Sequence, residues 1–246
     1  MDIPPQLNNF NGDAWKFKAL EDYSSYKAFH DFATNLSALQ AYEESFQYYA
    51  AIPEIHPHGT EKFLRGHKRD DVERALNHYG AQTIVSLCTC YEVAIRNFFE
   101  CVFIAYPDRL FDFIGPESAK GHVSLRDITI HKSRDELLIE LSRRGAAVAS
   151  KGDYGKSLLR ASNLVRSGLD IETAALAALQ KTRNVIVHDA AHPMALPSIT
   201  DAHDTVDSAI ESLCKIGLAT GIPGRYSCID QSNTIVMQSV ALLGKE

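Results

Sequence analysis

The chain has 246 residues, of which 45% are hydrophobic and 23% are charged, and this composition is that of a globular protein rather than a disordered one. Its formal net charge of -6 argues against a surface that coats nucleic acid as a whole. A local basic patch is still compatible with this total, because phosphate binding needs only a patch.

The cysteines favour a reducing compartment. Their number is odd, and Cys88, Cys90 and Cys101 fall in one strongly apolar segment, where free cysteine behaves as a small hydrophobic residue. The first residues show neither the basic nor the apolar run of a signal peptide, so we expect none. Charged residues interrupt the apolar stretch at 84–106, which predicts a buried helix and no membrane span. We therefore expect a cytoplasmic protein with no membrane partner.

The first third of the chain is predicted to be an N-terminal helical extension, residues 1–75. Aromatic residues recur through 13–50 at a spacing that predicts one or two amphipathic helices. Prolines and a glycine predict a loop over 51–60. A short helix is expected over 68–79.

The strongest predicted helix covers 82–106. Its apolar residues follow the three-to-four spacing of a buried face: Ile84, Leu87, Cys88, Tyr91, Ile95, Phe98 and Val102. Ser133 and Glu136 then form a capping box that predicts a helix to about Ala149. A further helix is expected over 154–166.

A late helix is predicted over 170–190, with Asp170 as its N-cap. We expect one of its faces to point to the core, formed by Ile171, Ala174, Ala175, Ala178, Leu179, Thr182 and Ile186. Another helix follows at about 201–219.

The tail, residues 221–246, carries two strand-like runs at 225–229 and 234–240 with turn-forming residues between them. This pattern predicts a small β-hairpin. The predicted fold class is accordingly all-α, a helical bundle with a small C-terminal β-hairpin.

The polar side of the 170–190 helix carries the sequence Arg183-Asn184-Val-Ile-Val-His188. Asn184 and His188 are four residues apart and therefore share a face of the helix. Arg183 lies further round, but its long side chain can bend toward the same end. None of the three belongs to the predicted apolar face.

This hexapeptide, near the end of a late helix in an all-helical chain, resembles the signature of the HEPN superfamily. The resemblance covers roughly residues 80–220, and we assign 76–220 as the HEPN domain. The chain is more similar to the stand-alone ribonuclease-type (RiboL-PSP-like) domains than to those paired with nucleotidyltransferases. The latter often carry a tyrosine two residues after the histidine, where this chain has Ala190.

The resemblance implies a homodimer whose two motifs face one cleft, and a metal-independent RNA endonuclease without cofactor, typical of toxins and antiviral defence effectors. RNA supplies its own nucleophile, the 2′-hydroxyl. His188 would act as acid or base, Arg183 would bind the scissile phosphate, and Asn184 would orient either of them. An antitoxin or another regulatory protein is an expected partner.

Glu92, on the predicted 82–106 helix, is a fourth candidate catalytic residue. It is placed to reach Arg183 and position it, as acidic residues of the early helix do in some relatives. The alternative is an ordinary i,i+4 ion pair between Glu92 and Arg96.

Several basic residues are candidates for binding the RNA backbone. They are Lys181, Arg143, Arg144, Lys68 and Arg69. Such runs are more often solvated faces, and they would bind RNA in a salt-sensitive manner if they lined the dimer cleft.

Two alternatives stay open. His188 and His192, with Asp189 between them, resemble a zinc-protease motif, with His203 as a further candidate ligand. However, Pro193 ends the helix directly, and we predict no metal site. The second alternative is a HEPN module without catalysis that binds RNA or a protein partner through its aromatic N-terminal region.

Overall fold

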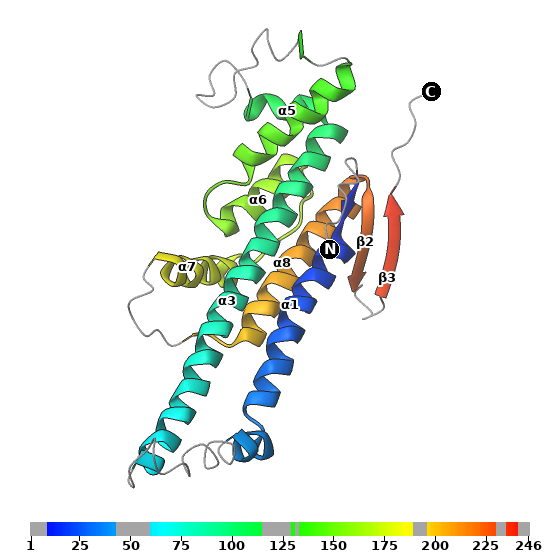
Figure 1. The fold of residues 1–246 in the computed structure, drawn as a ribbon. Helices are drawn as coiled ribbons and strands as arrows, with labels where there is room; N and C mark the ends of the chain where they lie inside the picture. The colour runs from blue at the N-terminus through cyan, green and yellow to red at the C-terminus, as the bar shows by residue number, and fades with distance from the viewer. Residues whose placement is uncertain are drawn as a thin grey trace.

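A computed structural model of the chain describes residues 9–42, 60–114, 129–130, 133–188, 196–229 and 235–240, with the backbone alone for 60–69, 227–229 and 235–240. The fold is all-α with a small sheet, which confirms the predicted class (Figure 1). The helices are α1 (Gly12–Ala33), α3 (Thr60–Ala105), the 3-10 helix η1 (Pro107–Asp112), α5 (Arg134–Ala149), α6 (Tyr154–Leu164), α7 (Ala174–His188) and α8 (Ile199–Thr220). The strands are β1 (Phe10–Asn11), β2 (Gly224–Ile229) and β3 (Ile235–Val240).

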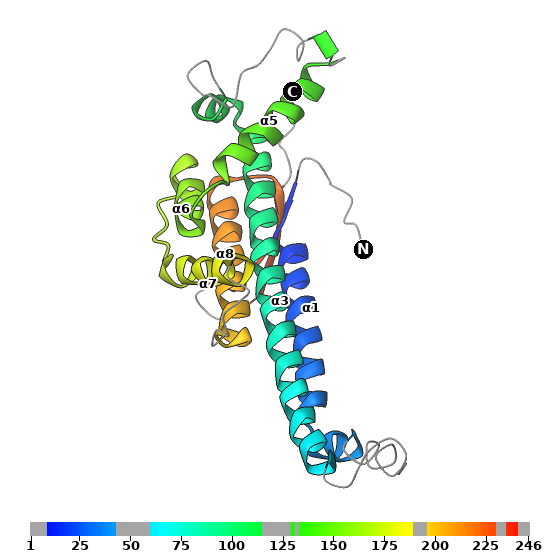
Figure 2. The same cartoon turned by 60° about the vertical axis from the view of Figure 1, so that its left-hand side comes forward.

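The long helix α3 forms the centre of the bundle, with α1 and α8 running beside it and α5 packed on it (Figures 1 and 2). The two helices predicted at 68–79 and 82–106 are one continuous helix, so that prediction was wrong. Gly80 between them does not break α3, because side chains of Tyr26, Leu196 and Ile199 pack around it. The predicted buried face is confirmed, since all seven of its residues from Ile84 to Val102 are buried.

The small sheet joins the two ends of the described chain. β2 and β3 pair antiparallel, from Gly224 opposite Val240 to Ile229 opposite Ile235, which confirms the predicted hairpin. β1 adds to it in parallel, with Phe10 beside Gly224. Phe10 is fully buried and meets the ring of Phe98 on α3 edge-to-face, with 5.2 Å between centroids.

Side-chain caps set the starts of several helices. Ser133 accepts a hydrogen bond from the Glu136 amide at α5, as predicted, and Asp153 and Ser198 cap α6 and α8 in the same way. α8 ends at Gly221, whose φ of +69° is a left-handed conformation that glycine adopts without a steric penalty. These local signals place most helix boundaries within a few residues of their predicted positions.

α7 departs from the prediction, because it begins at Ala174 and not at Asp170. Thr173, the residue before α7, packs closely against Gly155 in α6. The predicted cap, Asp170, therefore lies outside the helix. Among the described residues, no helix is both long and apolar enough to cross a membrane.

The glycines of the helices give a test of the packing. A methyl group on Gly217 would lie 2.5–2.6 Å from the buried ring and hydroxyl of Tyr226, whereas one on Gly80 would meet side-chain carbons at 3.3–3.5 Å. We expect Gly217→Ala to lower the free energy of unfolding by about 1–3 kcal/mol despite the better helix propensity of alanine. Gly80→Ala, the matched control, should be near neutral or stabilising. Urea denaturation followed by circular dichroism measures both, and equal effects would contradict the packing argument.

Candidate functional site

Helix α7, which carries the motif, lies across the direction of α3 and α8 and packs on α3, α6 and α8 (Figures 1 and 2). Its core-facing residues are Leu176 and Leu179, followed by the half-buried Ile186. The predicted core face was wrong in part, because Ala174, Ala175 and Ala178 are exposed. Two leucines bury more apolar area than three alanines, and their burial sets how the helix is turned.

Arg183 lies on the inner side of α7, close to Glu92 of α3. Its Nη2 is 3.8 Å from the Glu92 Oε1, and the two side chains are 26% and 34% exposed. Nη1 donates a hydrogen bond to the Asn184 Oδ1 at 3.2 Å. Of the two partners considered for Glu92, the geometry therefore gives it Arg183 across the helices and not Arg96 along α3.

A residue without any sequence signal completes this arrangement. The hydroxyl of Tyr154, the first residue of α6, donates a short hydrogen bond to the same Glu92 Oε1. Burial, together with this hydrogen bond, raises the pKa of Tyr154. Burial likewise raises the pKa of the nearby Cys88 thiol to about 12, with the Glu92 charge adding to the shift. Both groups therefore stay neutral at physiological pH. We call Glu92, Tyr154 and Arg183 the carboxylate cluster.

Gln180 fastens α7 to the start of α6. Its side-chain Oε1 accepts a hydrogen bond from the Tyr154 backbone N–H at 2.8 Å, and its Nε2 donates to the Gly152 carbonyl at 2.9 Å. One amide thus satisfies the Tyr154 N–H, which the first turn of α6 leaves open, and the carbonyl of Gly152 just before the helix. This bridge fixes the position of Tyr154 relative to Arg183, because Gln180 bonds the backbone of Tyr154 and lies one helical turn before Arg183.

The other motif residues lie on the solvent side of α7. Asn184 and His188 are both exposed. Five residues separate Arg183 from His188, which turns their side chains about 140° apart around a helix. The two side chains therefore leave α7 in different directions, while the Arg183 Nη1 bonds Asn184, which lies on the His188 face.

The solvent side of α7 also has an apolar character. Ala174, Ala178 and Val185 share it with Lys181 and His188 at the three-to-four spacing of one helical face, and all of them are exposed. Val185 keeps 39% of its surface exposed. We call these five residues the outer face of α7.

The predicted RNA-binding residues are spread over the molecule. Lys181 lies on the outer face of α7, and Arg143 and Arg144 lie on α5 within 4.0 and 3.0 Å of Glu140. Lys68 and Arg69 lie in the early part of α3, where the structure describes the backbone alone. About 48 Å of helix separates Lys68 from Glu100, whose charge is close to Arg143. These basic pairs therefore lie at opposite ends of α3.

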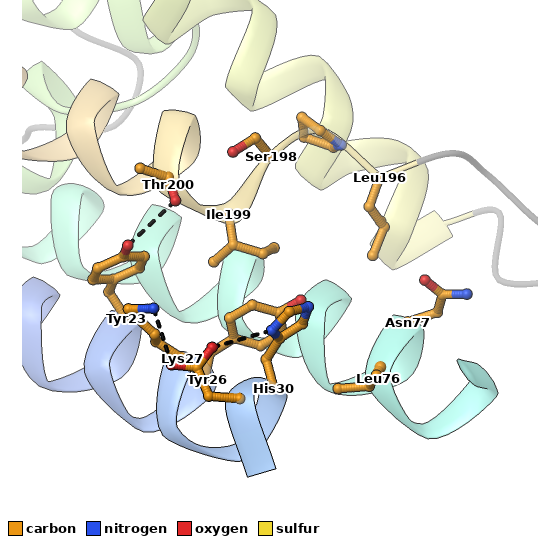
Figure 3. A pocket seen from close by; sticks show the side chains of 12 residues that line it. Tyr23, Tyr26, Lys27, His30, Leu76, Asn77, Leu196, Ser198, Ile199 and Thr200 are labelled. Atoms are coloured by element: carbon orange, nitrogen blue, oxygen red, sulfur yellow. Dashed lines mark hydrogen bonds and ion pairs between the residues drawn. The ribbon is translucent and has the colours of Figure 1, made fainter. Parts of the chain in front are cut away.

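A groove of about 420 Å³ lies away from the motif, between α1, α3 and the start of α8 (Figure 3). Part of its polar lining is paired within the protein, since Lys27 bonds Asp31 at 3.0 Å and the Tyr23 hydroxyl lies 3.2 Å from the Thr200 Oγ1. No predicted site residue lines this groove. Its chemistry does not select one class of ligand.

The residues considered for zinc do not come together in the part of the chain that the structure describes. Asp189 and His192 lie outside the described residues. His203 stacks on Tyr23 with ring centroids 4.7 Å apart, and its Nδ1 lies 3.0 Å from the Asp204 Oδ1. Across the described ranges, no three histidine, cysteine or acidic side chains are grouped as metal ligands.

Comparison with protein-family models, with curated proteins and with solved structures finds no match to this chain. The resemblance to the HEPN superfamily therefore depends on the motif and on its position in a helical bundle. The geometry adds the contact of Arg183 with Glu92, which the sequence offered as one of two possibilities.

Glu100 on α3 is a half-buried carboxyl whose charge affects how stability depends on pH. Burial raises the pKa of this half-buried carboxyl, while Arg143 and Arg96 oppose the shift. Because the folded-state pKa lies above the unfolded one, the stability that Glu100 contributes below the unfolded pKa is lost as the pH rises through the folded pKa. We expect Glu100→Gln to stabilise the protein at pH 7 and to have little effect at about pH 4, near the ordinary pKa of glutamate. Thermal denaturation at both pH values measures this, with Glu73→Gln as an exposed control on α3. A pH-independent effect would contradict it.

Proposed function

We propose that this protein is a metal-independent RNA endonuclease of the HEPN type, with Arg183, Asn184 and His188 as its working groups. The observation that carries the proposal is the placement of Arg183. Its guanidinium is ion-paired with Glu92 at 3.8 Å, its Nη2 makes no hydrogen bond to any described residue, and its side chain is 26% exposed. An arginine held in this way is suited to binding a phosphate of the RNA backbone.

The chemistry needs only groups that this chain and its substrate supply. The 2′-hydroxyl oxygen of RNA attacks the adjacent phosphorus and loses its proton to a base, while the bond from phosphorus to the 5′-oxygen breaks and that oxygen takes up a proton. A histidine can perform either proton transfer near neutral pH. Arg183 would stabilise the extra negative charge on the phosphate. The products are a 2′,3′-cyclic phosphate and a 5′-hydroxyl, and DNA is inert because it lacks the nucleophile.

The proposal includes a second copy of the chain. The side chains of Arg183 and His188 leave α7 in different directions, and the HEPN resemblance implies a second copy at the site. The outer face of α7 is exposed and includes Ala174, Ala178 and Val185 together with His188, so a two-fold pairing through it would bring two histidines together. We therefore propose a homodimer with a shared cleft.

A nuclease that cuts the RNA of its own cell has to be restrained. We propose a role as a toxin or antiviral defence effector in the cytoplasm, controlled by an antitoxin or another regulatory protein. This role follows from the activity and from the family resemblance.

The rival function is a HEPN module without catalysis that binds RNA or a protein partner. The observation that favours it is the exposure of large apolar side chains on and after α1, among them Phe17, Phe32 and Leu36 at 61%, 69% and 75%. Exposed groups of this size often mark interaction surfaces. A binding module would keep its function after His188→Gln, whereas a nuclease would lose it.

The first test uses cellular RNA in the presence of EDTA. We expect the wild type to cut it and leave cyclic-phosphate ends, and His188→Ala to be slower by about 10²–10⁴-fold, the usual contribution of an acid or base. The matched control is His78→Ala, an exposed histidine of α3 that bonds Gln82 and should leave cutting unchanged. Sequencing of the cleaved ends measures both. If well-folded wild type did not cut RNA, the nuclease proposal would be contradicted and the binding module would be favoured.

The second test concerns the dimer. A glutamate at Val185 would place an unpaired charge in the proposed interface, so Val185→Glu should yield monomers and abolish cutting while the fold stays intact. The control is Leu169→Glu, which lies outside α7 and has the same exposure of 39%. Analytical ultracentrifugation gives the mass of each. A wild type that is monomeric and cuts RNA would refute the shared cleft.

A further inference from the structure

The Glu92 carboxylate lies between Tyr154 and Arg183, and its contacts with these two residues differ in kind. The Tyr154 hydroxyl makes a short hydrogen bond to Oε1, while the Arg183 Nη2 is 3.8 Å from the same oxygen. A hydrogen bond from a guanidinium needs a separation of about 3.2 Å or less. Glu92 is therefore hydrogen-bonded to the tyrosine and only electrostatically paired with the arginine.

Arg183 is consequently held in place although not all of its N–H donors have a hydrogen-bond acceptor among the described residues. Nη1 bonds the neighbouring Asn184 at 3.2 Å, and Nε is buried with no acceptor among the described residues. A buried donor without an acceptor costs free energy. The buried Nε is closed to an incoming ligand, but Nη2 makes no hydrogen bond to any described residue and the side chain is 26% exposed, so an anion with several oxygens, such as a phosphodiester, can accept from it.

We propose that Tyr154 is a positioning residue that, by occupying the Glu92 carboxylate, keeps Arg183 from closing on it and available to an RNA phosphate. The phosphate part of this inference rests on the proposed function. The coupling from Tyr154 through Glu92 to Arg183 is a property of the folded chain and is tested separately.

Tyr154 is itself fixed from three directions. Gln180 accepts from its backbone N–H at 2.8 Å, and the Tyr91 hydroxyl donates to its carbonyl at 3.1 Å. The rings of Tyr91 and Tyr154 pack with centroids 5.2 Å apart. A phenol held this way loses little entropy when it bonds Glu92, and its raised pKa keeps it a neutral donor.

The experiment is a double-mutant cycle of Tyr154→Phe and Glu92→Gln, read from the Arg183 Nε–H resonance in nitrogen-15 NMR spectra. The resonance is assigned by its loss in Arg183→Lys. We expect Tyr154→Phe to shift this signal and slow its hydrogen exchange, because Glu92 then bonds the guanidinium directly. In Glu92→Gln, adding Tyr154→Phe should change the signal little. Tyr106→Phe, which removes a hydroxyl that bonds the Thr220 carbonyl, is the control and should not move it.

The second arm measures binding of a non-cleavable probe, a short oligoribonucleotide with 2′-O-methyl groups, by fluorescence anisotropy. We expect Tyr154→Phe to weaken binding about tenfold, as for loss of one hydrogen bond to a charged group, and Glu92→Gln to restore it in the double variant. An unmoved Arg183 resonance, or an equal effect of Tyr154→Phe with and without Glu92, would overturn the positioning role. A shifted resonance with no probe binding by the wild type would retain that role and refute the proposed function instead.

Discussion

The burial of one face of α3 is the constraint on which the remaining structure depends. The residues on this face, from Ile84 to Phe103, are buried by α1, α5 and α8. Apolar residues of these three helices join them in one continuous core. Since a helix buries only one stripe, the polar residues between the apolar ones are left at its edges. Glu92 is such a residue, and its position at the margin of the core is what lets α6 and α7 reach it.

The carboxylate cluster shows how a polar group at such a margin is stabilised. A half-buried carboxylate needs a hydrogen-bond donor and a counter-charge, and here they come from Tyr154 of α6 and Arg183 of α7. Two sets of contacts therefore determine the orientation of α7, its two buried leucines and the polar contacts of Arg183 and Gln180. Arg183 thus helps to position α7, while its Nη2 makes no hydrogen bond to any described residue.

Sequence patterns predicted the elements better than their relations. The N-cap at Ser133, the buried face of α3 and the C-terminal hairpin follow from signals within a few residues of one another, and all are confirmed. The core face of α7 was predicted wrongly in part, at its alanines, because alanines and leucines give similar periodicity and only packing distinguishes them. Tyr154 was missed because 62 positions separate it from Glu92, and local patterns carry no information on such contacts. The catalytic roles of Arg183, Asn184 and His188 stay predictions.

The pairing of β1 with β2 has a consequence for synthesis of the protein. Phe10 is covered by Tyr226 and pairs with Gly224 of a strand that lies 214 positions further along the chain. Until that strand is synthesised, Phe10 has no sheet partner, so the sheet cannot form earlier during translation. A polypeptide truncated before β2 would leave Phe10 without this cover, as a site for chaperones and proteases.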